Sequence, residues 1–182
     1  MTYYGAKHLA DSYRTVRKNT LAIAEEIPAD KYGFKAAPET MSVGEMLAHL
    51  AASYAWQIDL HSKHTDFVDF AFFAAEREKG VADERALAAA GKDAIVKALR
   101  ERGDKFAAFL ESLDEKTLGE TVGFPPPVQP SQKSRLEMLL GVKEHEMHHR
   151  GQLMLLQRML GIVPHLTRAR QQMQAQAPAV SR

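Results

Sequence analysis

Three of the eight histidines of the chain lie close together, at His145, His148 and His149. The surrounding residues predict a helix from about Ser134 to Gly161, and residues four apart on a helix lie on the same face. His145 and His149 should therefore point in the same direction, and two imidazoles so placed can bind one transition metal ion. His148 is rotated by roughly 100° from His149, so we expect it to flank this pair or to support it.

The two aligned histidines interrupt an apolar stripe on this predicted helix. The other members of the stripe are Met138, Val142, Leu153, Leu156 and Leu160. A helix packed in a core normally carries leucine at such positions, and burying two polar rings is unfavourable unless they find partners. A metal ion would provide a partner for both rings, and the rest of the chain would then have to bring a third ligand to the pair.

The composition restricts both the ligands and the partners. The chain has 182 residues and no cysteine, so any metal site must use histidine, aspartate, glutamate or water. A net charge of +1 provides no strong field to attract nucleic acid or an anionic membrane. The N-terminus has no signal-peptide pattern, and no apolar run approaches the roughly 20 residues of a membrane span. We therefore expect a cytoplasmic protein that binds neither nucleic acid nor membranes.

Apolar residues recur at helical spacing in four long segments, and no segment shows the alternation typical of a strand. The predicted helices cover residues 6–26, 43–62, 92–112 and 134–161. The second and fourth begin with capping-box patterns, at Ser42–Glu45 and Ser134–Glu137. We therefore predict an all-α protein, most simply a four-helix bundle with long connectors, where facing helices commonly build metal sites. This domain should span residues 1–164, and residues 165–182 should form a polar, frayed tail.

The connectors between these helices have distinctive compositions. Phe67–Phe73 contains four phenylalanines, which could close one end of the bundle or form part of a subunit interface, and less readily the wall of a substrate pocket. A short helix is predicted over residues 83–90, and Gly103 weakens the middle of the third long helix. The connector at residues 114–133 contains four prolines, which exclude helix there.

The remaining histidines have ordinary explanations when each is considered alone. His49 lies on a flank of the apolar face of the second predicted helix, where a single histidine is more often a packed core residue than a ligand. His8 lies near the start of the first helix and is expected to be solvated or partly packed. His61 and His64 lie where the second helix should end, and positive character suits a helix C-terminus.

The segment from His145 to His149 also matches the H-E-x-x-H pattern of zinc peptidases, with Glu146 as the catalytic glutamate. That interpretation needs a third ligand further along the chain. The extended form of the pattern requires glycine and histidine where this chain has Gln152 and Leu155, and no acidic residue follows Glu146. The peptidase interpretation is therefore disfavoured.

A different family fits the sequence better. The chain resembles the DinB/YfiT-like family of bacterial metal-binding four-helix bundles at Ser12–Val16, Glu26–Asp30, Ser42–Leu50 and His145–Leu153. The last of these segments carries a fairly specific His-x3-His-x-Gly-Gln pattern, and the resemblance runs from the first helix to Gly161.

In this family, one histidine of the second helix and two of the fourth bind a single divalent metal ion. The resemblance therefore implies that His49, His145 and His149 are the metal ligands. Three imidazoles leave a position open for water or substrate, as in a catalytic centre, and they suit zinc or nickel best, although copper and iron also accept them.

The resemblance implies either a metal-dependent hydrolase or a thiol transferase acting on a small-molecule substrate. In both reactions an open Lewis-acid site deprotonates a bound water or a bound low-molecular-weight thiol, which then attacks. No residue can be assigned as a general base, so no catalytic side chain is named and thiol transfer is slightly favoured. The alternative is a non-enzymatic bundle that binds a structural metal, a small molecule or no metal at all.

The resemblance also bears on the oligomeric state. Relatives often pair through their helices, and the phenylalanines of Phe67–Phe73 offer apolar surface for such pairing. We therefore expect a homodimer.

Overall fold

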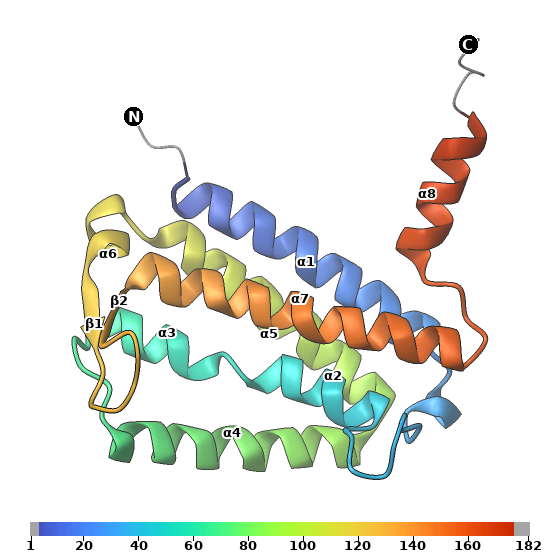
Figure 1. The fold of residues 1–182 in the computed structure, drawn as a ribbon, viewed down its shortest axis with the longest axis horizontal. Helices are drawn as coiled ribbons and strands as arrows, with labels where there is room; N and C mark the ends of the chain where they lie inside the picture. Colours follow the sequence, from blue (N-terminus) through green and yellow to red (C-terminus); the bar gives the residue numbers. More distant parts are fainter. Residues whose placement is uncertain (1–3, 177–182) are drawn as a thin grey trace.

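A computed structural model describes residues 4–176, and this part of the chain is predominantly helical (Figure 1). The helices are α1 (Ala6–Glu26), α2 (Val43–Ala52), α3 (Ala55–Ser62), α4 (Phe70–Ala90), α5 (Lys92–Ser112), α6 (Glu115–Gly119), α7 (Arg135–Met159) and α8 (His165–Gln176). A 3-10 turn, η1 (Ala29–Lys31), follows α1, and two short strands, β1 (Thr121–Gly123) and β2 (Gln132–Ser134), precede α7. Within residues 4–176, no helix is long and apolar enough to cross a membrane.

The long helices α1, α5 and α7 run side by side with α2, and Figure 1 shows them as the body of the molecule. Their facing sides form two apolar clusters that fill the interior. The first includes Ile23, Leu47, Leu99 and Leu153, and the second includes Tyr13, Phe106, Leu110 and Leu139. The bounds of α1 and α5 agree with the prediction, because both helices carry the apolar periodicity that these clusters require.

The two capping boxes have different outcomes. At the start of α2, the Ser42 hydroxyl accepts a hydrogen bond from the Glu45 N–H at 3.2 Å, and the Glu45 carboxylate accepts one from the Ser42 N–H at 2.7 Å. At the start of α7, Ser134 accepts from the Glu137 N–H at 3.1 Å. The Glu137 carboxylate instead lies 3.6 Å from the Lys133 ammonium group, so only half of the second box forms among the described residues.

The prediction of one continuous helix at residues 43–62 is wrong, because the helix is interrupted between α2 and α3. Tyr54, at the break, has φ −116° and ψ 4°, outside the helical region. Its side chain is buried, and its ring centroid lies 4.8 Å from that of Phe106. The packing of Tyr54 against α5 therefore overrides the local helical preference.

The prediction of a short helix at residues 83–90 is also wrong, because α4 begins much earlier. Asp69 caps it by accepting a hydrogen bond from the Phe72 N–H at 2.7 Å, so most of the phenylalanine-rich connector is helical. Among the described residues of α4 none is buried. A helix that buries nothing has no apolar periodicity, which removes the signal that sequence analysis uses.

The connector at residues 114–133 is not irregular throughout. It contains α6 and the antiparallel pair β1–β2, in which Val122 faces Lys133, and the prolines lie in the loop between the strands. Val122 is buried in a third apolar cluster with Leu60, Val68 and Met138. The pair was not predicted because strands of three residues are too short to show alternation.

Residues 165–176 form helix α8 where the sequence predicts a frayed tail. The His165 ring lies 3.1 Å from the side-chain oxygen of Asn19, and Arg168 forms an ion pair with Glu26, so α8 is attached to α1. Its residues are polar on most sides, which hid the helix from an apolar-pattern argument. The division of the chain at residue 164 remains a prediction, and residues 177–182 lie outside the described part.

Candidate metal centre

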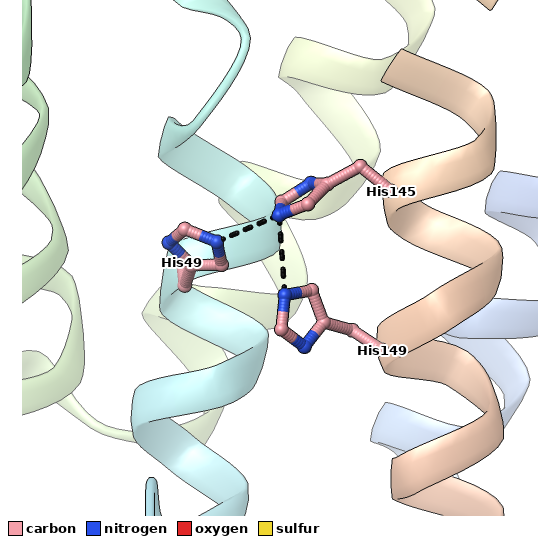
Figure 2. Close-up of side chains that lie close together, drawn as sticks. All are labelled: His49, His145 and His149. Atoms are coloured by element: carbon pink, nitrogen blue, oxygen red, sulfur yellow. Dashed lines mark hydrogen bonds between the residues drawn. The ribbon is translucent and has the colours of Figure 1, made fainter. Parts of the chain in front are cut away.

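The structure brings His49, His145 and His149 together between α2 and α7. Figure 2 shows the three rings pointing toward one another, with one ring from α2 and two from α7. The Nε2 atom of His145 lies 3.0 Å from that of His49 and 3.1 Å from that of His149. All three side chains are partly buried, and each offers a ring nitrogen within 4.8 Å of the others. The four-residue spacing on α7 aligns two of these rings, and the packing of α2 supplies the third.

The spacing of the three nitrogens fits a small divalent ion. Zinc–nitrogen bonds are about 2.0–2.1 Å long, so two ligands of a tetrahedral ion lie roughly 3.3–3.4 Å apart. The observed separations of 3.0 and 3.1 Å need to widen by only a few tenths of an ångström. Imidazole donors also suit first-row ions such as zinc and nickel, so both the geometry and the chemistry of the donor set fit one metal ion.

Hydrogen bonds to the other ring nitrogens orient two of these rings. The Nδ1 atom of His49 lies 2.8 Å from Oε1 of Glu84 on α4, and Nδ1 of His149 lies 2.7 Å from Oε1 of Gln152. An ionised carboxylate and an amide oxygen only accept hydrogen bonds, so in both rings Nδ1 carries the proton. A ring protonated only at Nδ1 presents the lone pair of Nε2 to the centre of the triad, and metal-binding histidines usually donate their other ring N–H in this way.

The environment favours the neutral form of two rings of α7, those of His145 and His149. Burial, and after it the neighbouring rings of His149, His49 and His148, together lower the pKa of His145 to about 4. Burial also lowers the pKa of His149, against an opposing effect of the Gln152 hydrogen bond. Because only neutral imidazole binds a metal ion, these rings can act as ligands at neutral pH.

His148 lies outside the triad, in the flanking position that the sequence predicts. The Gln152 side chain links His148 to the site. The Nε2 atom of Gln152 lies 3.3 Å from Nε2 of His148, and the Oε1 atom of Gln152 contacts His149. One amide therefore spans both rings. His148 is therefore linked to the triad through Gln152 and through an edge contact between its ring and that of His149.

Glu146 is directed away from the histidines, into the core. It is 1% exposed, and its carboxylate lies 2.8 Å from the guanidinium group of Arg17 on α1. Its side chain therefore lies in the interior and not at the helix surface. A carboxylate held in this way cannot serve as the base of an H-E-x-x-H peptidase, so the structure gives that alternative no support.

The other histidines have structural partners. His61 is buried, with its ring 2.9 Å from the Gln57 side-chain oxygen and 3.1 Å from the guanidinium group of Arg135, so it is not a simple helix-end residue. His64 lies 3.0 Å from the Glu120 carboxylate on the surface. The ring of His8 accepts a hydrogen bond from the backbone at the start of α1.

A cleft of about 1210 Å³ lies beside the triad, and both His49 and His145 line it. It is bounded by α2, α3, α4, α5, α7 and the loop between β1 and β2. Its apolar wall includes Tyr54, Trp56, Phe73, Phe124 and Met138. Gly141 precedes His145 by one helical turn, and a Cβ atom there would meet nothing within 4 Å, which leaves open space next to that ring.

Charged side chains also line this cleft. Arg102 pairs with Asp83, and Lys79 pairs with Glu76. Arg77 and Lys105 line it as well, and neither forms an ion pair within residues 4–176. The cleft therefore combines an aromatic wall with cationic groups that can receive an anionic group of a ligand.

Sequence analysis missed Glu84, the carboxylate that orients His49. Its partner lies 35 residues away on another helix, and the stretch around Glu84 carries several charged residues of which most are exposed. Nothing in the local pattern separates this glutamate from its neighbours, so only the packing of α4 along α2 identifies it.

Comparison with known proteins identifies a family and a similar fold. Residues 12–153 match the family model of the DinB superfamily. The fold is similar to the crystal structure of a DinB-like protein, YjoA, from Bacillus subtilis, with a TM-score of 0.59 and 24% sequence identity over 84% of this chain and 92% of that chain. A search of curated proteins gives no significant match.

Proposed function

Since the chain belongs to the DinB superfamily, we propose that it is a metal-dependent enzyme in which His49, His145 and His149 bind one divalent ion. Zinc and nickel are the ions that best suit three imidazoles in this setting. The observation that carries the proposal is the convergence of three Nε2 atoms whose rings are oriented from outside by Glu84 and Gln152. We also assign the fold to the DinB type of four-helix bundle, formed by α1, α2 with α3, α5 and α7.

When bound, the ion would supply Lewis acidity that lowers the pKa of a thiol or a water and so provides a nucleophile near neutral pH. The protein would hold His145 and His149 neutral and leave the side facing the cleft open. An ionisable base beside the site is needed for hydrolysis more than for thiol transfer. Glu84 is already bonded to His49 and Glu146 is buried against Arg17, so we favour transfer of a thiol over hydrolysis.

The cleft is the proposed place for the substrate. An electrophile with an apolar or aromatic part would pack against Trp56 and Phe73, and the carboxylates of a low-molecular-weight thiol would lie near Arg77 or Lys105. The sulfur would displace the electrophile's leaving group, and the thiol proton would pass to solvent. A small thiol that carries carboxylates is therefore the cosubstrate that the cleft fits best.

Turnover by the metal-loaded protein tests this proposal. The zinc or nickel form would be mixed with a panel of small thiols and an aromatic chloride, and release of chloride would be followed. We expect thiol-dependent release that is lost in His149→Ala and kept in His64→Ala, a surface histidine that pairs with Glu120 away from the triad. Hydrolysis would be tested by mixing the same metal-loaded protein with an ester. Absence of both thiol transfer and ester hydrolysis would contradict an enzymatic function.

The second candidate is a non-enzymatic metal-binding bundle. A structural zinc site is normally closed by four protein ligands, and its binding free energy is part of the folding free energy. Among the described residues only three ligands converge, which favours an open site. His149→Ala distinguishes the two functions: a structural metal would cost several kcal/mol of stability, and an open site would lose metal with a much smaller loss of stability.

We further propose that the protein is a homodimer. Phe67, Phe70 and Phe73 are 49%, 57% and 52% exposed at and near the start of α4, which is unusual for phenylalanine in a monomer. Sedimentation of the wild type and of Phe70→Ser would test this. A wild type that sediments as a monomer at micromolar concentration would contradict it.

A further inference from the structure

Arg17 of α1 lies at the centre of the helices and is 4% exposed. Its guanidinium group donates hydrogen bonds to the Glu146 carboxylate on α7, at 2.8 and 3.1 Å. It also donates to the carbonyl oxygen of Leu99 on α5 at 3.0 Å and to that of Leu50 on α2 at 3.2 Å. One side chain therefore connects α1 with the three helices packed around it.

Two of these acceptors belong to residues that directly follow candidate ligands in the sequence. Leu50 follows His49, and Glu146 follows His145. Arg17 contacts α2 through the Leu50 carbonyl and α7 through the Glu146 side chain, which is buried in the core, and in this way it fixes where the two backbones lie while the histidine rings meet on the cleft side. The distance between these backbones determines whether the ring of His49 can reach those of α7.

The bond to Leu50 lies where α2 stops. The last carbonyl groups of a helix have no intrahelical donor, and a cation near them is favourable. Arg17 therefore satisfies a carbonyl that the break after α2 leaves free. Arg102 of α5 donates a longer hydrogen bond to the next carbonyl oxygen of this helix end, that of Ala51, at 3.4 Å.

The surroundings of Arg17 are shaped for this side chain. The rings of Tyr13 and Tyr54 lie 5.5 and 5.2 Å from its guanidinium carbon, within the range of cation–π contacts. Its aliphatic part crosses α5 at Gly103, where a Cβ atom would lie 2.9 Å from the Arg17 Cγ. The glycine that weakens α5 locally is thus explained by the close passage of this arginine.

An apolar core would hold these helices without fixing their separation so closely. Leucine side chains can repack with small shifts, whereas a planar guanidinium group with several directed hydrogen bonds permits little movement. Replacing a buried ion pair with apolar residues is often neutral for stability. A contribution to folding stability therefore does not by itself explain why a buried ion pair occupies this position.

We propose that Arg17, together with Glu146, is a positioning residue for the metal centre, which fixes α2 and α7 at the separation that brings the three histidines together. This inference rests on the proposed metal site. It predicts that loss of the pair weakens metal binding even when the protein remains folded and stable.

The test uses the double variant Arg17→Met/Glu146→Leu, which removes both charges and keeps similar side-chain volume. Zinc affinity would be measured by competition with a chelator, and the metal-free proteins would be unfolded with urea. The matched control is Arg100→Met, which removes an exposed α5–α1 ion pair with Glu25 that does not touch α2 or α7. If the double variant does not fold, Arg17→Lys serves in its place, because lysine keeps the charge without the planar fork.

We expect the zinc dissociation constant to rise by about 10- to 100-fold in the double variant, in the range found for residues that orient metal ligands. Arg100→Met should bind zinc like the wild type. A cobalt-loaded double variant should also show an altered visible spectrum, because that spectrum depends on ligand geometry. Wild-type zinc affinity in a folded Arg17 variant would overturn the inference, whereas a wild type that binds no zinc or nickel would refute the proposed function itself.

Discussion

Replacing Glu84 with alanine should weaken metal binding without unfolding the protein. This carboxylate accepts a hydrogen bond from Nδ1 of His49 at 2.8 Å, and it is the group that leaves the Nε2 lone pair of that ring facing the other two histidines. Without it, the ring can change tautomer or rotate, so part of the binding free energy must be used to orient it.

The size of the expected loss in zinc affinity follows from the partly exposed position of the His49–Glu84 pair. Loss of such a supporting group typically costs 10- to 100-fold in metal affinity, or about 1.4–2.8 kcal/mol. The side chains of His49 and Glu84 are 20% and 23% exposed, so water can replace part of the lost hydrogen bond. We therefore expect about a 10- to 30-fold rise in the dissociation constant for zinc. The metal-free protein should lose less than about 1 kcal/mol, as is usual for partly exposed pairs.

The assay is a competition titration with a zinc chelator, paired with urea unfolding of the metal-free proteins. Glu84→Gln should bind more tightly than Glu84→Ala, because the amide oxygen can still accept the hydrogen bond. Glu78→Ala is the matched control, since this residue is also on α4 and exposed. Zinc affinity equal to the wild type in Glu84→Ala would refute the role that we assign to Glu84.

Three further predictions concern other parts of the molecule. Gly141→Leu should fill the cleft beside the histidines, so that metal content is kept in elemental analysis and thiol transfer is lost; unchanged turnover would remove the cleft from the substrate site. Burial and then Arg135 lower the pKa of His61 to about 4, so protonation favours the unfolded chain and stability should fall as the pH drops from 6.5 toward 4. Urea unfolding at pH 7.5 and pH 5 should show a decrease on the order of 2 kcal/mol from this ring, absent in His61→Gln; equal decreases in both proteins would contradict it. Gly103→Ala should destabilise the protein by about 1–2 kcal/mol, because the added methyl group meets the Arg17 side chain. This loss is expected even though alanine is about 1 kcal/mol better than glycine in a helix. Higher stability of the variant in urea would contradict this packing.

The sequence was informative where local pattern and burial coincide. Helices α1, α5 and α7 each have an apolar face in the core, so their periodicity placed them within two residues of their observed ends. His145 and His149 were paired by helical spacing alone. His49 could be joined to them only through the family resemblance, because its spatial relation to α7 depends on how α2 packs.

The features that were missed depend on tertiary packing. Helix α4 contains no buried residue, so neither its length nor the role of Glu84 has a periodic signal. Arg17 and Glu146 are charged residues of the kind that usually lie on a surface, and only the assembled core shows that they face each other. Tyr54 breaks a helix that its local sequence favours because its ring fits between α1 and α5.

The most direct test of the metal centre is the metal content of untagged protein, measured by elemental analysis for the wild type and His49→Ala. If His49, His145 and His149 form one site, the wild type should contain about one zinc or nickel ion per chain and His49→Ala should lose it. Metal retained in His49→Ala would remove the ligand on α2 from the site. A wild type that contains no metal and takes up neither zinc nor nickel would contradict the proposed metal centre.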